Sequence, residues 1–484
     1  TCDINTSGRG RRIAVTYERI VFSPVTRLSG LMSVEVLVEK RRIVEANASS
    51  TMFRGFEWIM GDRQAADAVY MTQRVCGICS LAHGATASYL LDELYDNELT
   101  ENAQILRNIM YAADFLQNHI RHFYLFSLPD FVVMPDRPPF HGQNLMDARL
   151  NPEDNRRLAG NYFEAVKFAQ RSHEILALFG GKAPHQHSFV HGGVSVAPTA
   201  DKINRAQALI HDIGEFVKGT LIPDTELISR VYGDYYRIGM APARYLSFGL
   251  FKFGSKNERI LWRNGVLADG RLTPPQTERI HEDISHAWFE TAGSQEPQQK
   301  ELKPNPSKPG AYTWIKSVRY AGLPFQVGPL ARMIINGRYS GGSSTMDRIC
   351  ARSLETLLLT ELVQEWLKKL TPGPPPIRQK NRAIKTEVTA TTDAMRGALL
   401  HSARIVDDKV VWYNIITPTV WNFSPKDAHG QRGPAENALV GTEIPSSGLL
   451  FTILGRIVRS FDPCMPCAAH VLDCRGNVEA KMVL

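Results

Sequence analysis

The sequence predicts an α+β protein that is mostly helical, with a large helical bundle and peripheral β-hairpins or sheets. Three segments repeat apolar residues at helical spacing over several turns, namely residues 105–123, 203–217 and 349–370. A segment near the N-terminus alternates apolar and polar residues instead, as a half-buried strand does. Together these patterns indicate a helical core with strands at its edge.

The alternating segment begins at Val34. Val36 and Val38 continue it, the polar turn 39–42 follows, and residues 43–46 resume it. Two such runs around a polar turn predict an N-terminal hairpin.

The third helical segment is expected to end at residues 371–376, which read TPGPPP, because proline has no amide hydrogen and clashes with the preceding turn. This break is short, and the chain shows neither a sustained repeat nor a low-complexity linker. We therefore expect a single domain over residues 1–484. Residues 294–309, rich in Gln, Lys, Pro and Ser, are expected to form a surface loop.

The composition excludes several classes of protein. The chain of 484 residues is 43% hydrophobic and 22% charged, as in a folded protein with a sizeable core. Its net charge of +7 comes without a Lys/Arg cluster interleaved with aromatic residues, so we expect no nucleic-acid partner. No apolar run reaches the ~18 residues of a membrane span, and the opening TCDINTSGRGRR lacks the apolar stretch of a secretory signal. Export and membrane association are expected only through partner subunits.

Four of the seven cysteines form two Cys-x-x-Cys pairs, Cys76 with Cys79 and Cys464 with Cys467. Four thiolates suit zinc, an iron-sulfur cluster, or a nickel-iron centre in which some thiolates bridge two metals, and the spacing alone does not choose among these. A structural zinc site usually has its pairs about 12–20 residues apart, whereas most of this chain separates the two pairs. The other alternative is that the cysteines are small core residues.

Longer motifs surround both pairs: RVCGICSLAH at 74–83 and DPCMPCAAH at 462–470. They resemble the two cysteine motifs of nickel-iron hydrogenase large subunits of the uptake type. Further counterparts are FRGFE at 53–57, GGKAPH at 180–185, HGGV at 191–194, VGPLAR at 327–332, RGAL at 396–399 and PTVWN at 418–422. The resemblance covers nearly the whole chain and implies a catalytic subunit that cleaves H₂ reversibly into two protons and two electrons.

The resemblance implies that Cys76, Cys79, Cys464 and Cys467 all bind nickel. Cys79 and Cys467 would also bridge to an iron that carries carbon monoxide and cyanide. Cys464 would be the first proton acceptor.

Four further residues are implied around this centre. Arg396 resembles the arginine held above the two metals, and Asp130, in LPDF, would lie close to it. Thr419 and Leu399 would border the diatomic ligands. If RGAL stood alone, a surface salt-bridging arginine would be the favoured interpretation of Arg396. The alternative for Asp130 is a helix-terminal aspartate.

Glu57, His470 and the carbonyl of Ile415 resemble the ligands of a magnesium ion near the active site. His83 follows Cys79 by four residues, so both are expected on one helix face, where His83 would hydrogen-bond to the centre. The alternative for His83 is an ordinary core histidine.

Three features depart from the family pattern. Many relatives read RIEGH near the N-terminus and use its glutamate as the first proton relay, whereas this chain has Ser29, whose hydroxyl is neither a useful acid nor a base. Met395 stands where a proline often precedes the arginine. Residues 471–484 resemble a maturation peptide that a protease cleaves when nickel-insertion factors have loaded the site.

Cys2, Cys350 and Cys474 are too few to hold an electron relay, so the resemblance implies an iron-sulfur small subunit in an obligate heterodimer, possibly paired again. Three alternatives remain. They are a hydrogen-sensing subunit with the same metal site, the quinone-site subunit of respiratory complex I, and a non-catalytic scaffold stabilised by zinc.

Overall fold

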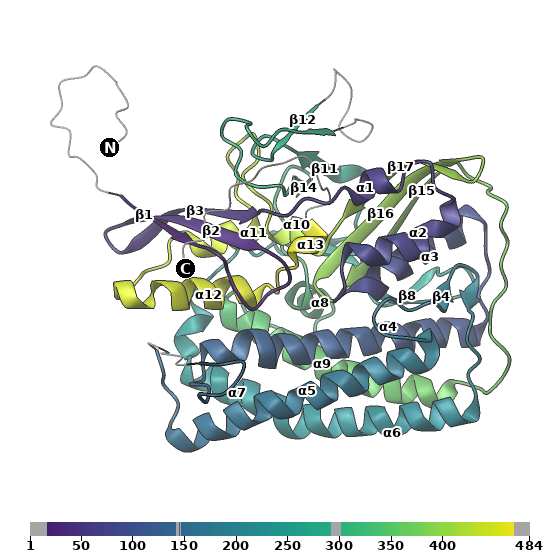
Figure 1. The fold of residues 1–484 in the computed structure, drawn as a ribbon, viewed down its shortest axis with the longest axis horizontal. Helices are drawn as coiled ribbons and strands as arrows, with labels where there is room; N and C mark the ends of the chain where they lie inside the picture. Colours follow the sequence, from purple (N-terminus) through teal and green to yellow (C-terminus); the bar gives the residue numbers. More distant parts are fainter. Residues whose placement is uncertain (1–16, 142–144, 146, 292–301, 469–484) are drawn as a thin grey trace.

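The long helices form one layer of the molecule, and most of the β-strands lie on one side of this layer (Figure 1). The computed structural model describes residues 17–141, 145, 147–291 and 302–468. Its helices are α1 (Phe56–Ile59), α2 (Ala68–Met71), α3 (Ser80–Leu94), α4 (Glu101–Arg121), α5 (Pro152–Gly180), α6 (Ala200–Phe216), α7 (Ile222–Val231), α8 (Pro329–Ile335), α9 (Thr345–Lys369), α10 (Pro418–Asn422), α11 (Pro434–Leu439), α12 (Leu450–Ser460) and α13 (Met465–Ala468). The predicted α+β class with a helical body is confirmed.

The three predicted helices correspond to α4, α6 and α9, and each begins at a side-chain cap. At the start of α4, the side chain of Thr100 accepts a hydrogen bond from the amide of Ala103. At the start of α6, the side chain of Thr199 accepts one from the amide of Lys202. Ser344 forms a reciprocal capping box with Asp347 at the start of α9. This helix ends directly before the proline-rich stretch, as predicted. Helix α4 continues into a π-helical turn over residues 122–127, which the apolar pattern had included in part.

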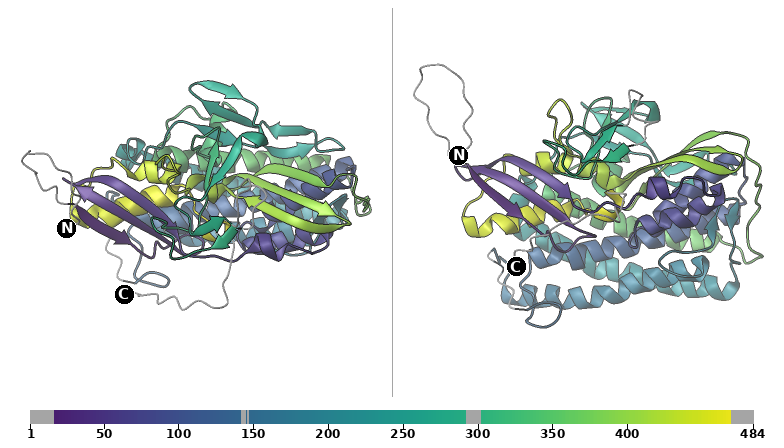
Figure 2. Two further views of the ribbon diagram at one scale, coloured as in Figure 1. Left: turned by 90° about the horizontal axis from the view of Figure 1, so that it is seen from above. Right: turned by 45° about the horizontal axis from the view of Figure 1, so that its top comes forward.

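The predicted hairpin is confirmed as β2 (Met32–Glu39) and β3 (Arg42–Ser50), to which β1 (Glu18–Phe22) adds an antiparallel third strand. A second antiparallel sheet has the order β15 (Glu387–Ala394), β16 (Gly397–Val406), β17 (Lys409–Ile416). Seen from above, the two sheets lie toward opposite ends of the molecule (Figure 2).

Short antiparallel ribbons complete the fold. They are β4 (Phe189–Val190) with β5 (Gly193–Val194), β6 (Tyr245–Ser247) and β10 (Arg271–Thr273) with β9 (Gly265–Ala268), β7 (Leu250–Phe253) with β8 (Arg259–Trp262), β11 (Ile280–Asp283) with β14 (Ser317–Tyr320), and β12 (Phe289–Thr291) with β13 (Leu302–Pro304). The loop expected over residues 294–309 is wrong for 302–304, because these residues gain backbone hydrogen bonds from β12. Residues 294–301 lie outside the described part of the chain.

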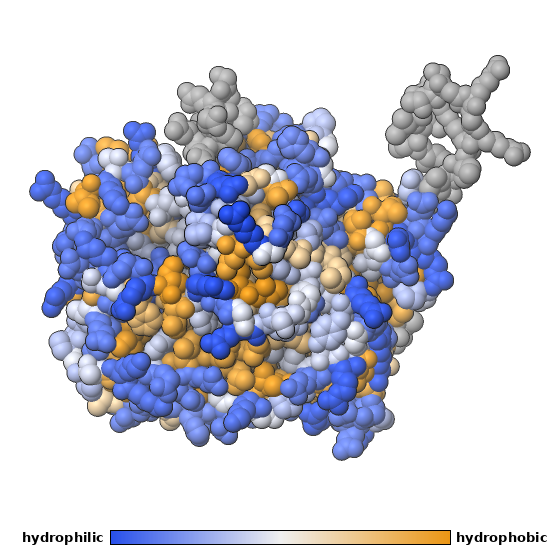
Figure 3. Space-filling model, turned by 180° about the vertical axis from the view of Figure 1, so that it is seen from behind, coloured by the Kyte–Doolittle hydropathy of each residue, from blue (hydrophilic) through white to orange (hydrophobic). Residues whose placement is uncertain are grey.

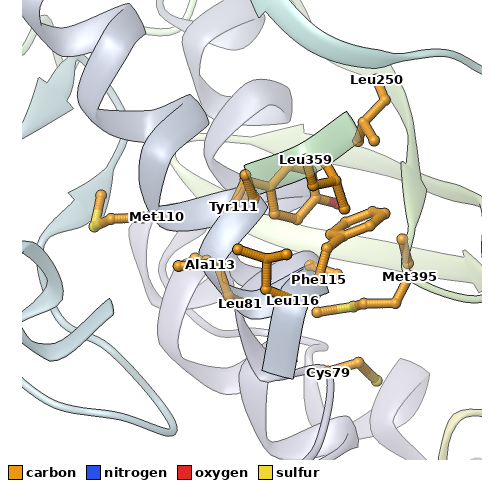
Figure 4. Packing of buried hydrophobic residues seen from close by; sticks show 14 of the residues in the cluster. Cys79, Leu81, Met110, Tyr111, Ala113, Phe115, Leu116, Leu250, Leu359 and Met395 are labelled. Carbon is orange, nitrogen blue, oxygen red and sulfur yellow. The ribbon is translucent and has the colours of Figure 1, made fainter. Parts of the chain in front are cut away.

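The hydrophobic core has two main parts. The larger part packs α3, α4, α5, α6 and α9 together and contains all four paired cysteines. In Figure 4, Cys79 lies at the edge of this packing, on the same side as Met395. The second part joins the β1–β3 sheet to α12 and includes Met465 and Ala468 of α13. Helix α13 therefore lies at the junction of the two cores.

Candidate metal centre

The four paired cysteines come together in one buried cluster. Their sulfur atoms all lie within 4.8 Å of one another. Cys76 Sγ is 3.3 Å from Cys464 Sγ, and Cys467 Sγ is 3.1 Å from Cys79 Sγ. The Sγ atoms of Cys464 and Cys467 are 3.0 Å apart. The two pairs predicted from sequence therefore form a single site.

Short backbone elements position both pairs. Cys76 follows a 3-10 turn in extended conformation, and Cys79 is the N-terminal cap of α3. Cys464 precedes α13, where its amide donates to the hydroxyl of Thr419 (3.0 Å). The hydroxyl of Thr417 donates to the carbonyl of Cys467 (2.8 Å).

Arg54 joins the two cysteine segments. Its guanidinium donates to the carbonyl of Val75, directly before Cys76, and to the carbonyl of Pro466 (2.7 Å), directly before Cys467. A third bond reaches the carbonyl of Arg74. Arginine suits this role because its planar group carries five donors in fixed directions. Arg54 belongs to the FRGFE motif, whose arginine the sequence analysis did not assign.

The cluster has the donor chemistry of a soft-metal site. Hydrogen bonding to Cys464 lowers the pKa of the Cys76 thiol well below its usual value and raises that of Cys79, while burial raises the pKa of Cys467. A bound cation would favour the thiolate form that binds soft metals. Four buried thiols around one space fit a soft or borderline metal.

Arg396 lies beside the cysteines and is held by Asp462. Its Nε donates to the backbone carbonyl of Asp462 and its Nη2 to the Asp462 carboxylate, both at 2.9 Å. Asn118 donates to the other carboxylate oxygen of Asp462 (2.9 Å). Although burial opposes it, Arg396 keeps the pKa of Asp462 below its ordinary value. The remaining nitrogen of Arg396, Nη1, is buried and has no hydrogen-bond partner among the described residues.

A small cavity next to the cysteines gathers several predicted residues. It is lined by Cys79, His83, Ala394, Arg396, Leu399, Pro418, Thr419, Cys464 and Cys467. Arg396, Leu399 and Thr419 thus border the same space as three of the thiols. An unpartnered donor on Arg396 fits a small acceptor ligand in this space.

The carboxylate that binds Arg396 is that of Asp462, whereas Asp130 pairs with two other arginines. Both oxygens of Asp130 accept from Arg459, at 2.9 and 3.0 Å, and Arg27 also donates to it. Although burial opposes them, Arg459 and Arg27 hold the pKa of Asp130 below its ordinary value. The motif order DPC, which puts Asp462 two residues before Cys464, was the available signal.

His83 contacts the cluster and begins a buried row of hydrogen bonds. Its Nε2 is 3.6 Å from Cys467 Sγ, so its sulfur contact comes from the C-terminal pair, not from Cys79. Its Nδ1 is 3.2 Å from His401 Nε2, and His401 Nδ1 is 2.9 Å from the hydroxyl of Tyr413. Burial lowers the pKa of His83 to about 4, so the imidazole is neutral near pH 7.

Glu57 and Ile415 meet at a second polar site near the chain's end. Glu57 accepts a hydrogen bond from the amide of Ile415 (3.1 Å). Lys316 Nζ is 3.7 Å from Glu57 and 2.8 Å from Glu282. Burial raises the pKa of Glu57 above its ordinary value. Two carboxylates around one ammonium leave a negative charge and oxygen donors that fit a magnesium ion.

The remaining predicted residues have different outcomes. His470 lies outside the described residues, although Ala468 lines a cavity together with Glu57, Lys316 and Ile415. Ser29 is buried against the cluster, and its carbonyl accepts from the amide of Met465 (2.8 Å). Lys316 was missed, because no local pattern distinguishes it from other lysines.

Fold and site together define an enzyme class with a buried four-cysteine metal centre. The model of the nickel-dependent hydrogenase family matches residues 54–137, 137–342 and 336–470. The chain therefore belongs to the nickel-dependent hydrogenase family, as the motifs predicted. It is a nickel-iron hydrogenase large subunit, the catalytic chain of an oxidoreductase acting on hydrogen.

Relatives match over almost the full chain. The periplasmic [NiFeSe] hydrogenase large subunit of Desulfomicrobium baculatum is 33% identical, covering 95% of this chain and 96% of its own. The uptake hydrogenase large subunit of Bradyrhizobium diazoefficiens is 27% identical, covering 96% and 97%. The reduced Ni-Fe-Se hydrogenase of D. vulgaris Hildenborough has a TM-score of 0.89 at 34% identity, covering 94% of this chain and all of that one. Likeness to selenium-containing enzymes was not predicted, and the cluster of this chain has cysteine at all four positions.

Proposed function

We propose that this subunit cleaves H₂ heterolytically at the four-cysteine cluster, in the uptake direction, and passes two electrons to an iron-sulfur small subunit. The observation that carries the proposal is the buried cluster of four sulfurs within 4.8 Å, bordered by an arginine with an unpartnered buried nitrogen. A soft donor set and a positive group at one enclosed space suit a reaction that separates charge.

The proposed cofactor is a nickel-iron centre with carbon monoxide and cyanide on the iron. Nickel would be held by all four cysteines, and Cys79 and Cys467 would also hold the iron. Such a centre supplies the Lewis acidity and redox chemistry that cleavage of H₂ needs. Arg396, Leu399 and Thr419 would surround the diatomic ligands, with the free Nη1 of Arg396 as a donor.

Cys464 is proposed to accept the first proton at its Sγ. Its sulfur is fully buried, so water does not compete there, and the bond from its amide to Thr419 fixes its position. Ser29 adjoins Cys464 in the backbone but supplies no carboxylate for the next transfer. The proton must leave by a route that differs from the glutamate relay of many relatives.

We also propose a magnesium ion bound by Glu57, the carbonyl of Ile415 and His470. The negative charge that remains on Glu57 and Glu282 beside Lys316 supports a cation here. Its expected role is to fix the end of the chain that follows Cys467. Removal of residues 471–484 by a maturation protease, once nickel-insertion factors have acted, would then close the site.

The proposed partner is an iron-sulfur small subunit in a heterodimer, and two such heterodimers would pair. The face opposite that of Figure 1 carries a broad band of hydrophobic side chains between polar ones (Figure 3), and Trp58 and Ile59 next to Glu57 are exposed. Surfaces of this kind mark protein contacts. Asp130 pairs with Arg459 and Arg27, so its proposed role near the centre is to hold these two arginines.

No helix among the described residues is long and apolar enough to cross a membrane. We propose membrane association through partner subunits.

The experiment is to purify the complex and determine nickel, iron and zinc together with the infrared spectrum between roughly 1900 and 2100 cm⁻¹, where metal-bound carbonyl and cyanide absorb. Nickel, iron, these bands and dye reduction by H₂ are expected. Arg396→Lys should lower the dye-reduction rate about a hundredfold with the metals retained, while Arg404→Lys, an exposed arginine of β16, should not. Zinc without bands would refute the proposal.

A further inference from the structure

The VGPLAR segment has no role in the site described so far, yet it packs against the turn that carries Arg396. A Cβ atom on Gly397 would lie 2.5 Å from the amide nitrogen of Gly328, and one on Gly328 would lie 3.0 Å from the carbonyl oxygen of Arg396. Both glycines have positive φ, 120° for Gly328 and 127° for Gly397. Only glycine permits this backbone contact without strain.

The other end of the segment is tied to the same turn through Arg332. Its Nη1 donates to the carbonyl of Ala394 (2.9 Å) and its Nη2 to the carbonyl of Met395 (2.8 Å). These are the two residues directly before Arg396, at the turn between β15 and β16.

The remaining donors of Arg332 are also satisfied. Glu355 accepts two bonds, both at 2.7 Å, and Asp393 accepts one at 3.1 Å. All five N–H groups of the guanidinium are therefore used. Glu355 also bonds to His119 Nε2 (2.7 Å), one residue along α4 from the Asn118 that binds Asp462.

Burial of this charged network is unfavourable, so a gain in folding stability does not explain its presence. The side chains of Arg332, Glu355 and Asp393 are fully buried, and two carboxylates face one guanidinium. Burying such charges costs several kcal/mol per ion, and apolar residues of similar size are often as stable or more so. What the network provides beyond packing is a fixed position for two carbonyl groups next to Arg396.

We propose that Arg332 is a positioning residue of the metal centre, which holds the Ala394–Met395 backbone and thereby directs the Arg396 guanidinium toward the cavity beside the cysteines. The proposal rests on the function proposed above for Arg396. It assigns VGPLAR to the support of RGAL: Gly328 lets the backbones approach, and Arg332 fixes the turn. Asn422 of PTVWN accepts from the amide of Val327 and donates to its carbonyl, both at 3.1 Å, and so helps to hold the VGPLAR segment in place.

The test compares Arg332→Lys with Arg319→Lys in the whole purified complex. Arg319 is a matched control because it is also buried, pairs with Asp427 and donates to backbone carbonyls. These carbonyls belong to the loop over residues 425–431 and not to the turn that carries Arg396. Arg332→Lys should lower kcat for dye reduction ten- to a hundredfold and shift the infrared bands of the iron ligands, with nickel retained. Arg319→Lys should leave both unchanged, whatever it does to the melting temperature.

The double variant Arg332→Lys/Arg396→Lys separates this proposal from the one on which it rests. If Arg332 acts through Arg396, the Arg332 change should have little further effect on kcat when Arg396 is already lysine. Fully additive losses, or unchanged bands in Arg332→Lys, would overturn the positioning role. An Arg396→Lys enzyme with normal activity would instead overturn the proposed function of Arg396.

If the Arg332→Lys complex fails to assemble, the kcat and infrared bands of Glu355→Gln test the proposal instead. This change weakens the two-bond contact to Arg332 without removing the arginine, so it should cause a smaller loss of kcat and a smaller band shift. Normal kcat and bands in Glu355→Gln would then overturn the proposal.

Discussion

The sulfur atoms of Cys79 and Cys467 lie 3.1 Å apart although 388 residues separate them in the chain. Cys79 begins a long helix of the bundle, whereas Cys467 lies in a four-residue helix at the junction of the two cores. The metal centre therefore depends on the packing of the whole chain and not on one local motif.

Removal of one sulfur should abolish nickel binding. We expect Cys467→Ser to reduce nickel in the purified complex to background, because a hydroxyl is a poor ligand for a soft metal. Cys350→Ser is the control, since Cys350 is partly buried and lies outside the cluster. Elemental mass spectrometry measures both. Full nickel in Cys467→Ser would contradict the assignment of this ligand.

Arg54 should matter for assembly of the centre more than for overall stability. Arg54→Met removes the bonds that tie the carbonyls of Val75 and Pro466 together, so the two pairs should converge less often and nickel per complex should fall severalfold. Arg63→Met, which removes a bond from an exposed arginine to Ile59, should leave nickel unchanged. Equal nickel contents in the two variants would show that Arg54 has no such role.

Asp130 and Asp462 should differ in what they affect. Asp462→Asn removes the charge partner of Arg396 and should lower the H₂ oxidation rate at least tenfold with nickel retained. Asp130→Asn leaves Arg459 and Arg27 without their carboxylate and should cost about 3 kcal/mol of stability. Its infrared bands should match wild type. A shift of the infrared bands in Asp130→Asn would show that Asp130 influences the metal centre.

Glu436 should make stability fall as the pH rises. Burial raises its pKa to about 7, while Ala48 and Tyr312 donate to its carboxyl group. Between about pH 4.5 and 7 the unfolded chain loses this proton before the folded one, so the folded state becomes relatively less stable through this window. Glu436→Gln keeps the acceptor oxygen but does not titrate, so it should add up to about 3 kcal/mol at pH 8 and little at pH 4.

Melting curves of wild type and Glu436→Gln across this pH range measure the effect. The gain in melting temperature should grow with pH and level off above 7. A gain that is the same at all pH values would show that packing, rather than ionisation, explains it.

Local patterns in the sequence were enough for several elements. The apolar periodicity of α6 and the alternation of β2 were readable because each element buries one face along a regular repeat. The same helical spacing predicted α4 and α9, although α4 is buried on all sides from Ala103 to Ile120. Helix α5 was not among the predicted helices, although its buried residues, such as Leu158, Tyr162 and Ala165, recur at helical spacing. Strands β15–β17 were missed because the end of the sheet around residues 393–400 is buried on both faces, which removes the alternation there.

By itself the sequence determined the chemistry of the centre: two thiol pairs, their motifs and an arginine in RGAL. Tertiary structure alone decided which groups meet, placing Asp462 rather than Asp130 at Arg396, His83 at Cys467, and Arg332 behind the turn of Arg396. The physical reason is the distance along the chain between the interacting residues. A motif specifies side chains and local backbone over a few residues, whereas these contacts form only when distant helices and strands pack together.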